Sequence, residues 1–598
     1  LSASIKSQPS DITTQAELEG LDLSYQASLT HRVAFQFDNS QQPSNPVFDW
    51  VPSTSQTDFI FHYDVAATDN CNSCHSNLAV HGGNRTEVKY CVTCHNPGST
   101  DANSGNTVDF KQMIHKLHRG ADLPSVLAGG EYSIYGYMDS KHDYLSLQFP
   151  RDIRDCEVCH AGTATGSDKQ TLTNQGDNWS EFASIKACGS CHDDLDFTQH
   201  YGGQTDDNNC MSCHSVNGIA GTIASRHIDS LDALKAQFVA SIIGIRNTGQ
   251  GDTPVIDFKV VDPTDNNSPY DILNDPEWTT SGARLSLQLS WSTSDYTNSG
   301  NGSTSTPANS VSIDALNTAT DNGDGSFSVT SGIAIPDGSL TPNIAAFGSG
   351  SVSIEGRAAI DLGTSASPDI QRVPITNVVE SFNINESDGS AKPRREIVKL
   401  ESCLNCHGTL SLHGDNRTDS IESCVTCHNP RNTDIEKRAI ASPPATDGKT
   451  EQSVDFKVMI HAIHAAGLRE TPIQVVGYGG TVHTYDEETV HYPGELNNCL
   501  SCHDNDTYIL PLTSDVLATT ISTGASIPDP SDDVVVSPMA SVCSSCHDTA
   551  SAQVHMELNG AHFSTTQADI DSGAVLEQCE LCHGEGKTYP VSSKHGIN

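Results

Sequence analysis

Every cysteine of this chain belongs to the pattern Cys-x-x-Cys-His, which occurs ten times and consumes all 20 cysteines. The pairs are Cys71 and Cys74, Cys91 and Cys94, Cys156 and Cys159, Cys188 and Cys191, Cys210 and Cys213, Cys403 and Cys406, Cys424 and Cys427, Cys499 and Cys502, Cys543 and Cys546, and Cys579 and Cys582. A single copy would fit a zinc half-site or a thioredoxin-like redox motif about as well as any other interpretation. Ten copies that leave no cysteine over instead indicate covalent haem, because two thiols at this spacing form thioethers to the two vinyl groups of one haem.

The histidine of each motif is the expected proximal ligand to its haem iron. These histidines are His75, His95, His160, His192, His214, His407, His428, His503, His547 and His583. The chain is therefore predicted to carry ten covalently bound c-type haems. Since bacteria attach c-type haem outside the cytoplasm, the chain is also predicted to be exported.

An internal repeat selects candidates for the second, distal ligand of each iron. CNSCHSNLAVHGGNRT, CVTCHNP and VDFKQMIHKLH in the first half correspond to CLNCHGTLSLHGDNRT, CVTCHNP and VDFKVMIHAIH in the second. The distal candidates are His81, His115, His118, His200, His227, His413, His461, His464, His555 and His595. His142 and His483 form a sixth repeated pair, for which propionate contacts or loop positions are favoured. His31, His62, His491 and His562 lack repeat partners and are expected at the surface.

The repeated segment with two histidines is predicted to be a helix. Thr107 and Ser453 are the expected N-caps, and an apolar stripe that includes Ile114 follows. His115 and His118 are three residues apart, so they project from one helix face about 5–6 Å apart. One iron cannot take both, because its own motif fills the opposite axial position. The pair should therefore serve two haems and draw them together.

The predicted fold class is multidomain, with two pentahaem regions of loops and short helices that alternate with β-barrel or sandwich-like domains. The predicted domains are an N-terminal β segment or partial β domain over residues 1–68, a pentahaem domain over 69–228, a β domain over 229–398 and a second pentahaem domain over 399–598. Alternating runs such as LDLSYQASLTHRVAFQF, ARLSLQLSW, GSFSVTSGIAI and GSVSIEGRAAI indicate the strands. Asp321, Asp324 and Gly325 fit either a calcium loop or a hairpin turn, and the missing ligand spacing favours the hairpin.

The net charge of −43 argues against nucleic acid or an anionic membrane surface as partner, because both would be repelled. No apolar run approaches the roughly 18 residues of a membrane-spanning helix. The sequence thus predicts an acidic protein without a transmembrane segment.

The two five-motif clusters, together with NLAVHGGNRT, CVTCHNP and VDFKQMIHKLHRG, resemble the outer-membrane decahaem cytochromes of the OmcA/MtrC family. The resemblance implies bis-histidine haems, a location at the cell surface or outside the cell, and transfer of electrons to metal oxides, flavins or electrodes. It also implies an electron donor, either an outer-membrane porin–cytochrome conduit or a periplasmic cytochrome. Family members usually have a larger N-terminal β domain and a cysteine pair in the central one, which is cysteine-free here.

Three functions are open at this point. The first is an electron conduit, with at most a metal or flavin reductase activity rather than a substrate-specific one. The second is a haem subunit of a homo-oligomer or extracellular conductive filament. The third is a multihaem reductase, which needs one iron with an open position. The conduit is favoured, because 16 of the 26 histidines lie outside the motifs, so a shortage of ligands for ten haems does not force an open position.

Overall fold

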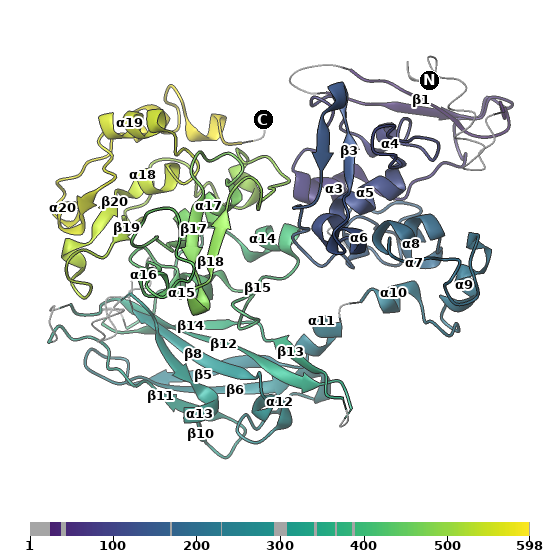
Figure 1. Ribbon diagram of the computed structural model, residues 1–598. Coiled ribbons are helices and arrows are strands. Elements are labelled where there is room, and N and C mark those ends of the chain that lie inside the picture. Colours follow the sequence, from purple (N-terminus) through teal and green to yellow (C-terminus); the bar gives the residue numbers. More distant parts are fainter. Residues whose placement is uncertain are drawn as a thin grey trace. The chain divides into compact units, whose positions relative to one another are not determined.

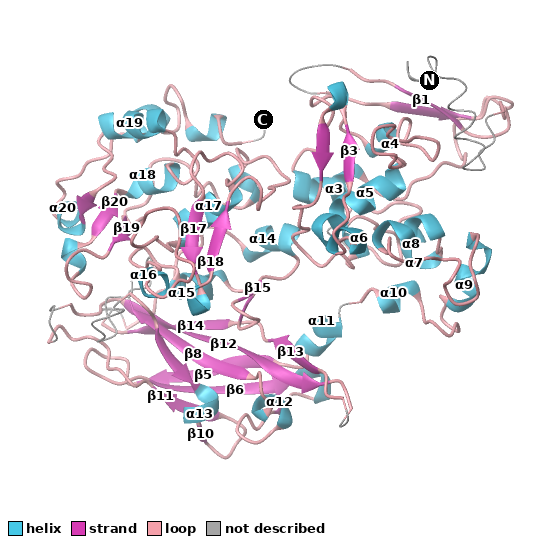
Figure 2. Cartoon of the chain, viewed as in Figure 1, coloured by secondary structure: helices cyan, strands magenta, loops and turns pink. Residues whose placement is uncertain are grey.

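The computed structural model describes residues 24–37, 43–167, 170–228, 230–291, 308–339, 344–364, 367–385 and 389–596. The chain divides into two compact units (Figure 1). Unit 1 comprises residues 1–229 and 493–495, and unit 2 comprises residues 230–492 and 496–598. In both units the regions around the Cys-x-x-Cys-His motifs consist of short helices joined by long loops (Figure 2).

Unit 1 has no helix longer than ten residues in its described part. Its helices are α3 (Thr68–His75), α4 (Val88–Cys91), α5 (Phe110–Arg119), α6 (Pro124–Leu127), α7 (Asn178–Glu181), α8 (Ile185–Cys191), α9 (Cys210–Cys213) and α10 (Ile223–Arg226). Its strands form two hairpins, β1 (His31–Ala34) with β2 (Val47–Trp50) and β3 (Ser133–Tyr135) with β4 (Lys141–Asp143).

The strand predicted over LDLSYQASLTHRVAFQF is shorter than its alternation suggests. Only residues 31–34 are a strand, residues 24–30 are turn and irregular backbone, and residues 21–23 lie outside the described part. The strand is held in place by Arg32, whose guanidinium donates two 2.7 Å hydrogen bonds to Asp49 on β2. Apolar alternation continues beyond the point where a partner strand is present, so the pattern overestimates the strand.

Unit 2 begins with helix α11 (Ser230–Lys235) and contains two open five-stranded sheets (Figure 1). The first has the order β10-β11-β6-β5, with β7 beside β6, and the second has the order β13-β12-β8-β9, with β14 beside β12. Its strands are β5 (Val239–Arg246), β6 (Val255–Asp262), β7 (Ser268–Pro269), β8 (Arg284–Trp291), β9 (Val311–Asp314), β10 (Thr320–Asp321), β11 (Phe327–Thr330), β12 (Ser349–Asp361), β13 (Ile370–Pro374) and β14 (Val378–Asn383). Two short helices, α12 (Pro276–Thr279) and α13 (Ala315–Thr318), lie among them.

One hydrophobic core joins the two sheets. Phe258 of β6, Leu287 of β8 and Ile354 of β12 are fully buried in it. This is the sandwich that alternating apolar strands predict, and the predicted alternation of β and loop-rich haem regions is confirmed. The barrel alternative is wrong for the described residues, because both sheets are open.

The long central strand β12 is buried on both faces, although its sequence alternates between apolar and polar residues. Val352 and Ile354 face the sandwich core. On the other face, Ser353 hydrogen-bonds Ser423 at 2.7 Å, and Glu355 accepts two hydrogen bonds from Arg417. The polar face of the sheet is therefore the support on which the second motif region packs.

The rest of unit 2 contains the second motif region. Its helices are α14 (Leu400–His407), α15 (Ile421–Cys427), α16 (Ile435–Arg438), α17 (Phe456–His464), α18 (Pro538–Cys543), α19 (Ala550–Leu558), α20 (Gln567–Asp571) and α21 (Glu580–His583). Its strands are β15 (Ser411–Leu412), β16 (Arg417–Thr418), β17 (Ile473–Val476), β18 (Val482–Tyr485), β19 (Thr519–Ser522), β20 (Val534–Val536) and β21 (Thr565–Thr566). None of the helices in the described ranges is long and apolar enough to span a membrane.

The predicted N-caps Thr107 and Ser453 are wrong by two residues. The cap positions are Asp109 and Asp455, and neither side chain makes a capping hydrogen bond. Instead the Thr107 hydroxyl accepts from the Asp109 amide at 3.1 Å, so the hydroxyl closes a turn just before the helix. Such turns are the usual alternative to capping for Ser and Thr.

The DNGDGS segment is a hairpin, as its sequence favours. Thr320 pairs with Ser328, and Asp321 pairs with Phe327. The Asp324 carboxylate accepts from the Ser326 amide at 3.0 Å, which stabilises the turn. No group of three or more His, Cys, Asp or Glu side chains that could together hold a metal ion is found there or elsewhere in the described residues.

Candidate haem sites

Each Cys-x-x-Cys-His motif forms a single helical turn. The amide of the motif histidine donates to the carbonyl of the first cysteine, for example from His160 to Cys156 at 2.9 Å and from His428 to Cys424 at 2.9 Å. A helical turn places residues three and four apart on the same side. The two thiols and the imidazole of a motif therefore face the same space, as covalent attachment of one ligated haem requires.

The structure places the ring of every motif histidine opposite the ring of one distal candidate, at ring-plane angles from 21° to 87°. We number the motifs 1 to 10 in chain order. The ring pairs, with centroid distances, are His75–His118 (6.2 Å), His95–His81 (5.9 Å), His160–His115 (5.9 Å), His192–His227 (6.4 Å), His214–His200 (6.1 Å), His407–His464 (6.1 Å), His428–His413 (6.0 Å), His503–His461 (5.9 Å), His547–His595 (6.0 Å) and His583–His555 (6.2 Å).

This spacing fits two imidazoles bound to one iron. Metal–nitrogen bonds to histidine are about 2 Å long, so two nitrogens on opposite sides of a metal lie about 4 Å apart and their ring centres about 6 Å apart. Rings in direct contact would be closer. The gap between each pair therefore has the width of an iron with its porphyrin plane.

Backbone carbonyls orient many of the rings. The Nδ1 atoms of His118, His464 and His227 contact the carbonyls of Ile114, Ile460 and Ile223, four residues earlier, at 2.8–2.9 Å. Among the motif histidines, the Nδ1 atoms of His95 and His428 likewise contact backbone carbonyls, those of Val108 and Val454. Occupying Nδ1 in this way leaves Nε2 free to face a metal, which is the usual arrangement for a histidine ligand.

Burial also favours the neutral form of several distal rings, the form that metal binding requires. Burial is the main cause that lowers the pKa of His115 to about 4, and the nearby His160 lowers it further. Burial likewise lowers the pKa of His461 and of His413 to about 4. These imidazoles are therefore deprotonated and available as ligands at neutral pH.

Helices α5 and α17 each present two histidines to two different motifs. On α5, His118 faces motif 1 and His115 faces motif 3. On α17, His464 faces motif 6 and His461 faces motif 8. Each helix thus holds two sites side by side, as the three-residue spacing predicts.

The pairing of motifs 4 and 5 could not be read from sequence proximity. His200 follows motif 4 by only eight residues, yet its ring faces His214 of motif 5. His227 follows motif 5, and its ring faces His192 of motif 4. The same exchange links motifs 9 and 10. His555 follows motif 9 but its ring faces His583 of motif 10, and His595 follows motif 10 but its ring faces His547 of motif 9.

The remaining histidines form no such ring pair among the described residues, although His483 lies close enough to His413 to contribute to lowering its pKa. Within the described chain, His142 and His483 face no motif histidine. They lie exposed on β4 and β18, where each imidazole covers a glycine, Gly136 or Gly477. His31 instead packs near Trp50.

Interactions between motif thiols give the order of the motifs in space. Burial is the main cause that raises the pKa of these thiols, and thiols of neighbouring motifs raise it further. The interacting pairs are Cys71 with Cys91, Cys159 with Cys71, Cys156 with Cys191, Cys210 with Cys188, Cys424 with Cys403, Cys403 with Cys502, Cys499 with Cys546, and Cys543 with Cys579. The motifs therefore follow one another as 2–1–3–4–5 in unit 1 and as 7–6–8–9–10 in unit 2.

The second thiols of motifs 1 and 6, Cys74 and Cys406, support the same order, and both are half-buried. Burial is the main cause that raises the pKa of Cys159 in motif 3 to about 12, and Cys74 adds to the rise. Burial is also the main cause that raises the pKa of Tyr492 to about 12, with further contributions from Cys502 of motif 8 and from Cys406. Cys74 therefore lies beside motif 3, and Cys406 lies near the same tyrosine as motif 8. The thioether bonds of Cys74 and Cys406 stay predictions, as do those of the other motif cysteines.

The chain is similar to known outer-membrane cytochromes. A family model described as outer membrane cytochrome MtrC/MtrF-like, domains II/IV, matches residues 63–228 and 395–596. The chain is 22% identical over 588 residues to the multiheme cytochrome MtrC of Shewanella baltica (strain OS185). The aligned region covers 94% of this chain and 76% of that protein. The crystal structure of the outer membrane decaheme cytochrome OmcA has a similar fold, with a TM-score of 0.67 and 23% identity over 96% of this chain and 81% of that one.

Proposed function

The chain belongs to the MtrC/MtrF-like family of outer-membrane cytochromes, and from this premise we propose that it carries ten bis-histidine c-type haems in two electron-transfer paths. The observation that supports the proposal most strongly is that each of the ten motif histidines faces a second imidazole about 6 Å away. The 20 motif cysteines would form the thioether bonds to the haems, and the ten facing imidazole pairs would bind the irons.

A c-type haem supplies an iron that gains and loses one electron at a time. The protein keeps consecutive sites close through α5, α17 and the exchanged distal histidines of motifs 4, 5, 9 and 10. Electrons would hop along 2–1–3–4–5 in unit 1 and along 7–6–8–9–10 in unit 2. Two fixed imidazoles at each site limit rearrangement when its charge changes, which favours rapid transfer.

Motifs 2, 5 and 10, at three of the four path ends, are the proposed points of entry and exit. Cys94 of motif 2 and Cys582 of motif 10 are exposed, as is Cys543 of the neighbouring motif 9. Beside motif 5, Val216 and Ile219 are 84% and 80% exposed. An apolar rim around an accessible site suits the close approach of an electron-transfer partner. We expect an outer-membrane conduit or periplasmic cytochrome to donate, and metal oxides or flavins outside the cell to accept.

A reductive titration followed by reoxidation tests this function. We expect the oxidised protein to take up ten electrons per chain. Ferric citrate, a suspension of iron(III) oxide and flavin mononucleotide should each reoxidise it without an added mediator. Carbon monoxide should bind no iron of the reduced protein, because both axial positions are filled.

The reductase alternative predicts a different outcome. One iron in ten would then bind carbon monoxide or nitrite, and nitrite or hydroxylamine would be turned over. That result, or failure of all three acceptors, would contradict the conduit.

A further inference from the structure

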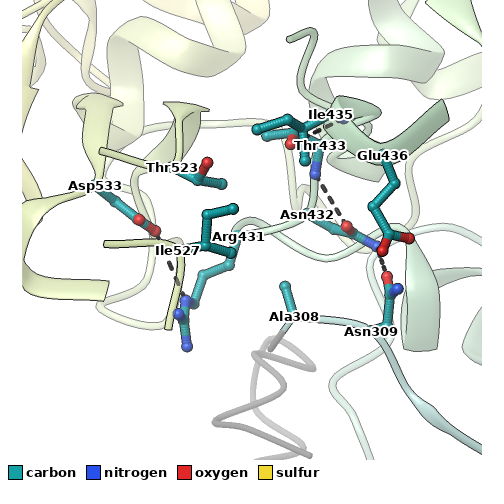
Figure 3. Close-up of a pocket in the computed structure, with 10 residues that line it drawn as sticks. All are labelled: Ala308, Asn309, Arg431, Asn432, Thr433, Ile435, Glu436, Thr523, Ile527 and Asp533. Carbon is teal, nitrogen blue, oxygen red and sulfur yellow. Dashed lines mark hydrogen bonds and ion pairs between the residues drawn. The ribbon is translucent and has the colours of Figure 1, made fainter. Parts of the chain in front are cut away.

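A small cavity of about 30 Å³ lies in unit 2. Figure 3 shows the residues that line it, among them Arg431, which follows the histidine of motif 7 by three residues. The loop after α15 contributes Arg431, the residue before β20 is Asp533, and Thr523 follows β19. The cavity has room for a water molecule, and its lining is polar enough to hold one.

Asp533 is almost completely buried at the edge of this cavity, with 2% of its surface exposed. Its Oδ2 accepts a 3.3 Å hydrogen bond from the Thr520 hydroxyl. Its Oδ1 is buried without a hydrogen-bond partner among the described residues. The nearest guanidinium atom, Nε of Arg431, is 3.9 Å from Oδ2, too far for a hydrogen bond (Figure 3). Such a carboxylate is poorly compensated for the loss of water.

The charges around Asp533 do not compensate its carboxylate for the lost water. Arg431 is the cation that faces Asp533, whereas Asp532 on the same loop and Glu451 before α17 both add negative charge. Asp529 is a further carboxylate close to Arg431. Burial is the main cause that raises the pKa of Asp533 to about 7, and Asp532 and Glu451 add to the rise while Arg431 opposes it.

Short contacts connect Asp533 with motif 7. The Thr520 amide donates to the Pro430 carbonyl at 2.9 Å, two residues after His428. The adjacent Thr519 hydroxyl donates to Asp455 at 2.6 Å, and the Val454 carbonyl next to Asp455 holds Nδ1 of His428 at 2.8 Å. These contacts place Asp533 close to the chain segment that carries the histidine of motif 7.

We propose that Asp533 binds a proton when the motif 7 site gains an electron and releases it when that electron leaves. The electron comes from the adjacent site of the path. The proton comes from solvent through the cavity, forms an O–H bond at Oδ1 of Asp533 and breaks no other bond in the protein. Added negative charge nearby favours the neutral carboxyl, and a carboxyl poised near neutral pH responds most strongly. The inference rests on the proposed function.

The internal repeat provides a natural contrast. The second copy of CVTCHNP continues with Arg431, and the first copy continues with Gly98. The corresponding position beside motif 2 therefore has no guanidinium to hold a buried carboxylate partly ionised. We expect this proton coupling at motif 7 and not through an equivalent pair at motif 2.

Infrared difference spectroscopy on the full haem-loaded protein tests the proposal. At pH 7, the reduced-minus-oxidised spectrum should contain a carboxylic acid band that shifts in D₂O. Asp533→Asn should remove the band, and the exposed Asp515→Asn, which makes the same change of charge, should keep it. Proton uptake on reduction, followed with an indicator dye in weak buffer, should fall in Asp533→Asn alone.

Potentials measured across pH give a second readout that does not depend on folding of Asp533→Asn. A fully coupled site changes its potential by about 59 mV for each tenfold change in proton concentration. In the wild type, the pH range over which the reduction potential changes should centre near pH 7. Arg431→Gln removes the opposing cation and should move this window to higher pH.

Two results would overturn the proposal. One is a carboxylic acid band that persists in Asp533→Asn, and the other is an unchanged window in Arg431→Gln. Failure of the proposed function is distinguishable, because the wild type would then not take up ten electrons.

Discussion

Replacing the two histidines of α5 should uncover two different irons. The His115 ring faces His160 at 5.9 Å, and the His118 ring faces His75 at 6.2 Å. His115→Ala therefore opens the distal position at motif 3, and His118→Ala opens it at motif 1. A ferric iron with one histidine and an open or water-filled position is expected to be high-spin.

The magnitude follows from the number of sites. Each single replacement should convert about one tenth of the ferric iron to the high-spin form, because one site of the ten motifs is affected. The double replacement should convert about two tenths, since separate sites add. Integrated electron paramagnetic resonance of the oxidised protein measures both fractions.

Two controls separate lost ligation from general damage. His142→Ala removes an exposed imidazole that faces no motif histidine in the described chain, so its spectrum should stay low-spin. Free imidazole added to His115→Ala should restore the low-spin signal. The reasoning is refuted if the double variant gives the same high-spin fraction as either single one, because both rings would then serve one iron.

Three further outcomes concern stability. Leu287→Ala should cost about 2–5 kcal/mol in the β sandwich, where Leu287 is fully buried, and should be visible as faster hydrogen exchange in that region. Arg438→Ala should cost about 3–5 kcal/mol, because it leaves the buried carboxylates of Asp434 and Asp447 without their cation, and thermal unfolding of the variant measures the loss. Asp533 binds its proton more tightly folded than unfolded, since burial raises its pKa from 3.8 to about 7, so its contribution to stability should fall as pH rises from about 4 to about 7. The fall is at most about 4 kcal/mol. Asp533→Asn should lack this dependence, and equal pH profiles of the two proteins would contradict it.

The sequence was sufficient to find which residues lie at the sites. The motif spacing requires a helical turn, and the structure has one at each motif. The internal repeat offered twelve candidates, and each of the ten that were preferred over His142 and His483 lies opposite a motif histidine. That these residues bind haem iron stays a prediction, as do the domain boundaries at 68, 228 and 398.

The pairing of the rings could be predicted only in part. The three-residue spacing of His115 and His118 indicates two sites, but it does not say which two. His200 is near His192 in sequence, yet it faces His214 of the following motif. Tertiary packing, rather than sequence distance, sets these partners.

The polar face of β12 was also beyond sequence analysis. Alternation along GSVSIEGRAAI normally indicates a strand with one face in solvent. Here Ser353 and Glu355 are buried, because α15 and β16 cover that face. Only the complete fold shows that this strand supports the second motif region.

The spin state of the iron in the oxidised wild type, measured together with the haem content by mass, tests the central claim most directly. We expect ten covalently attached haems per chain and ten low-spin ferric irons, because each motif histidine faces a second imidazole. A chain with fewer than ten haems, or a high-spin signal that accounts for one iron or more, would contradict the account.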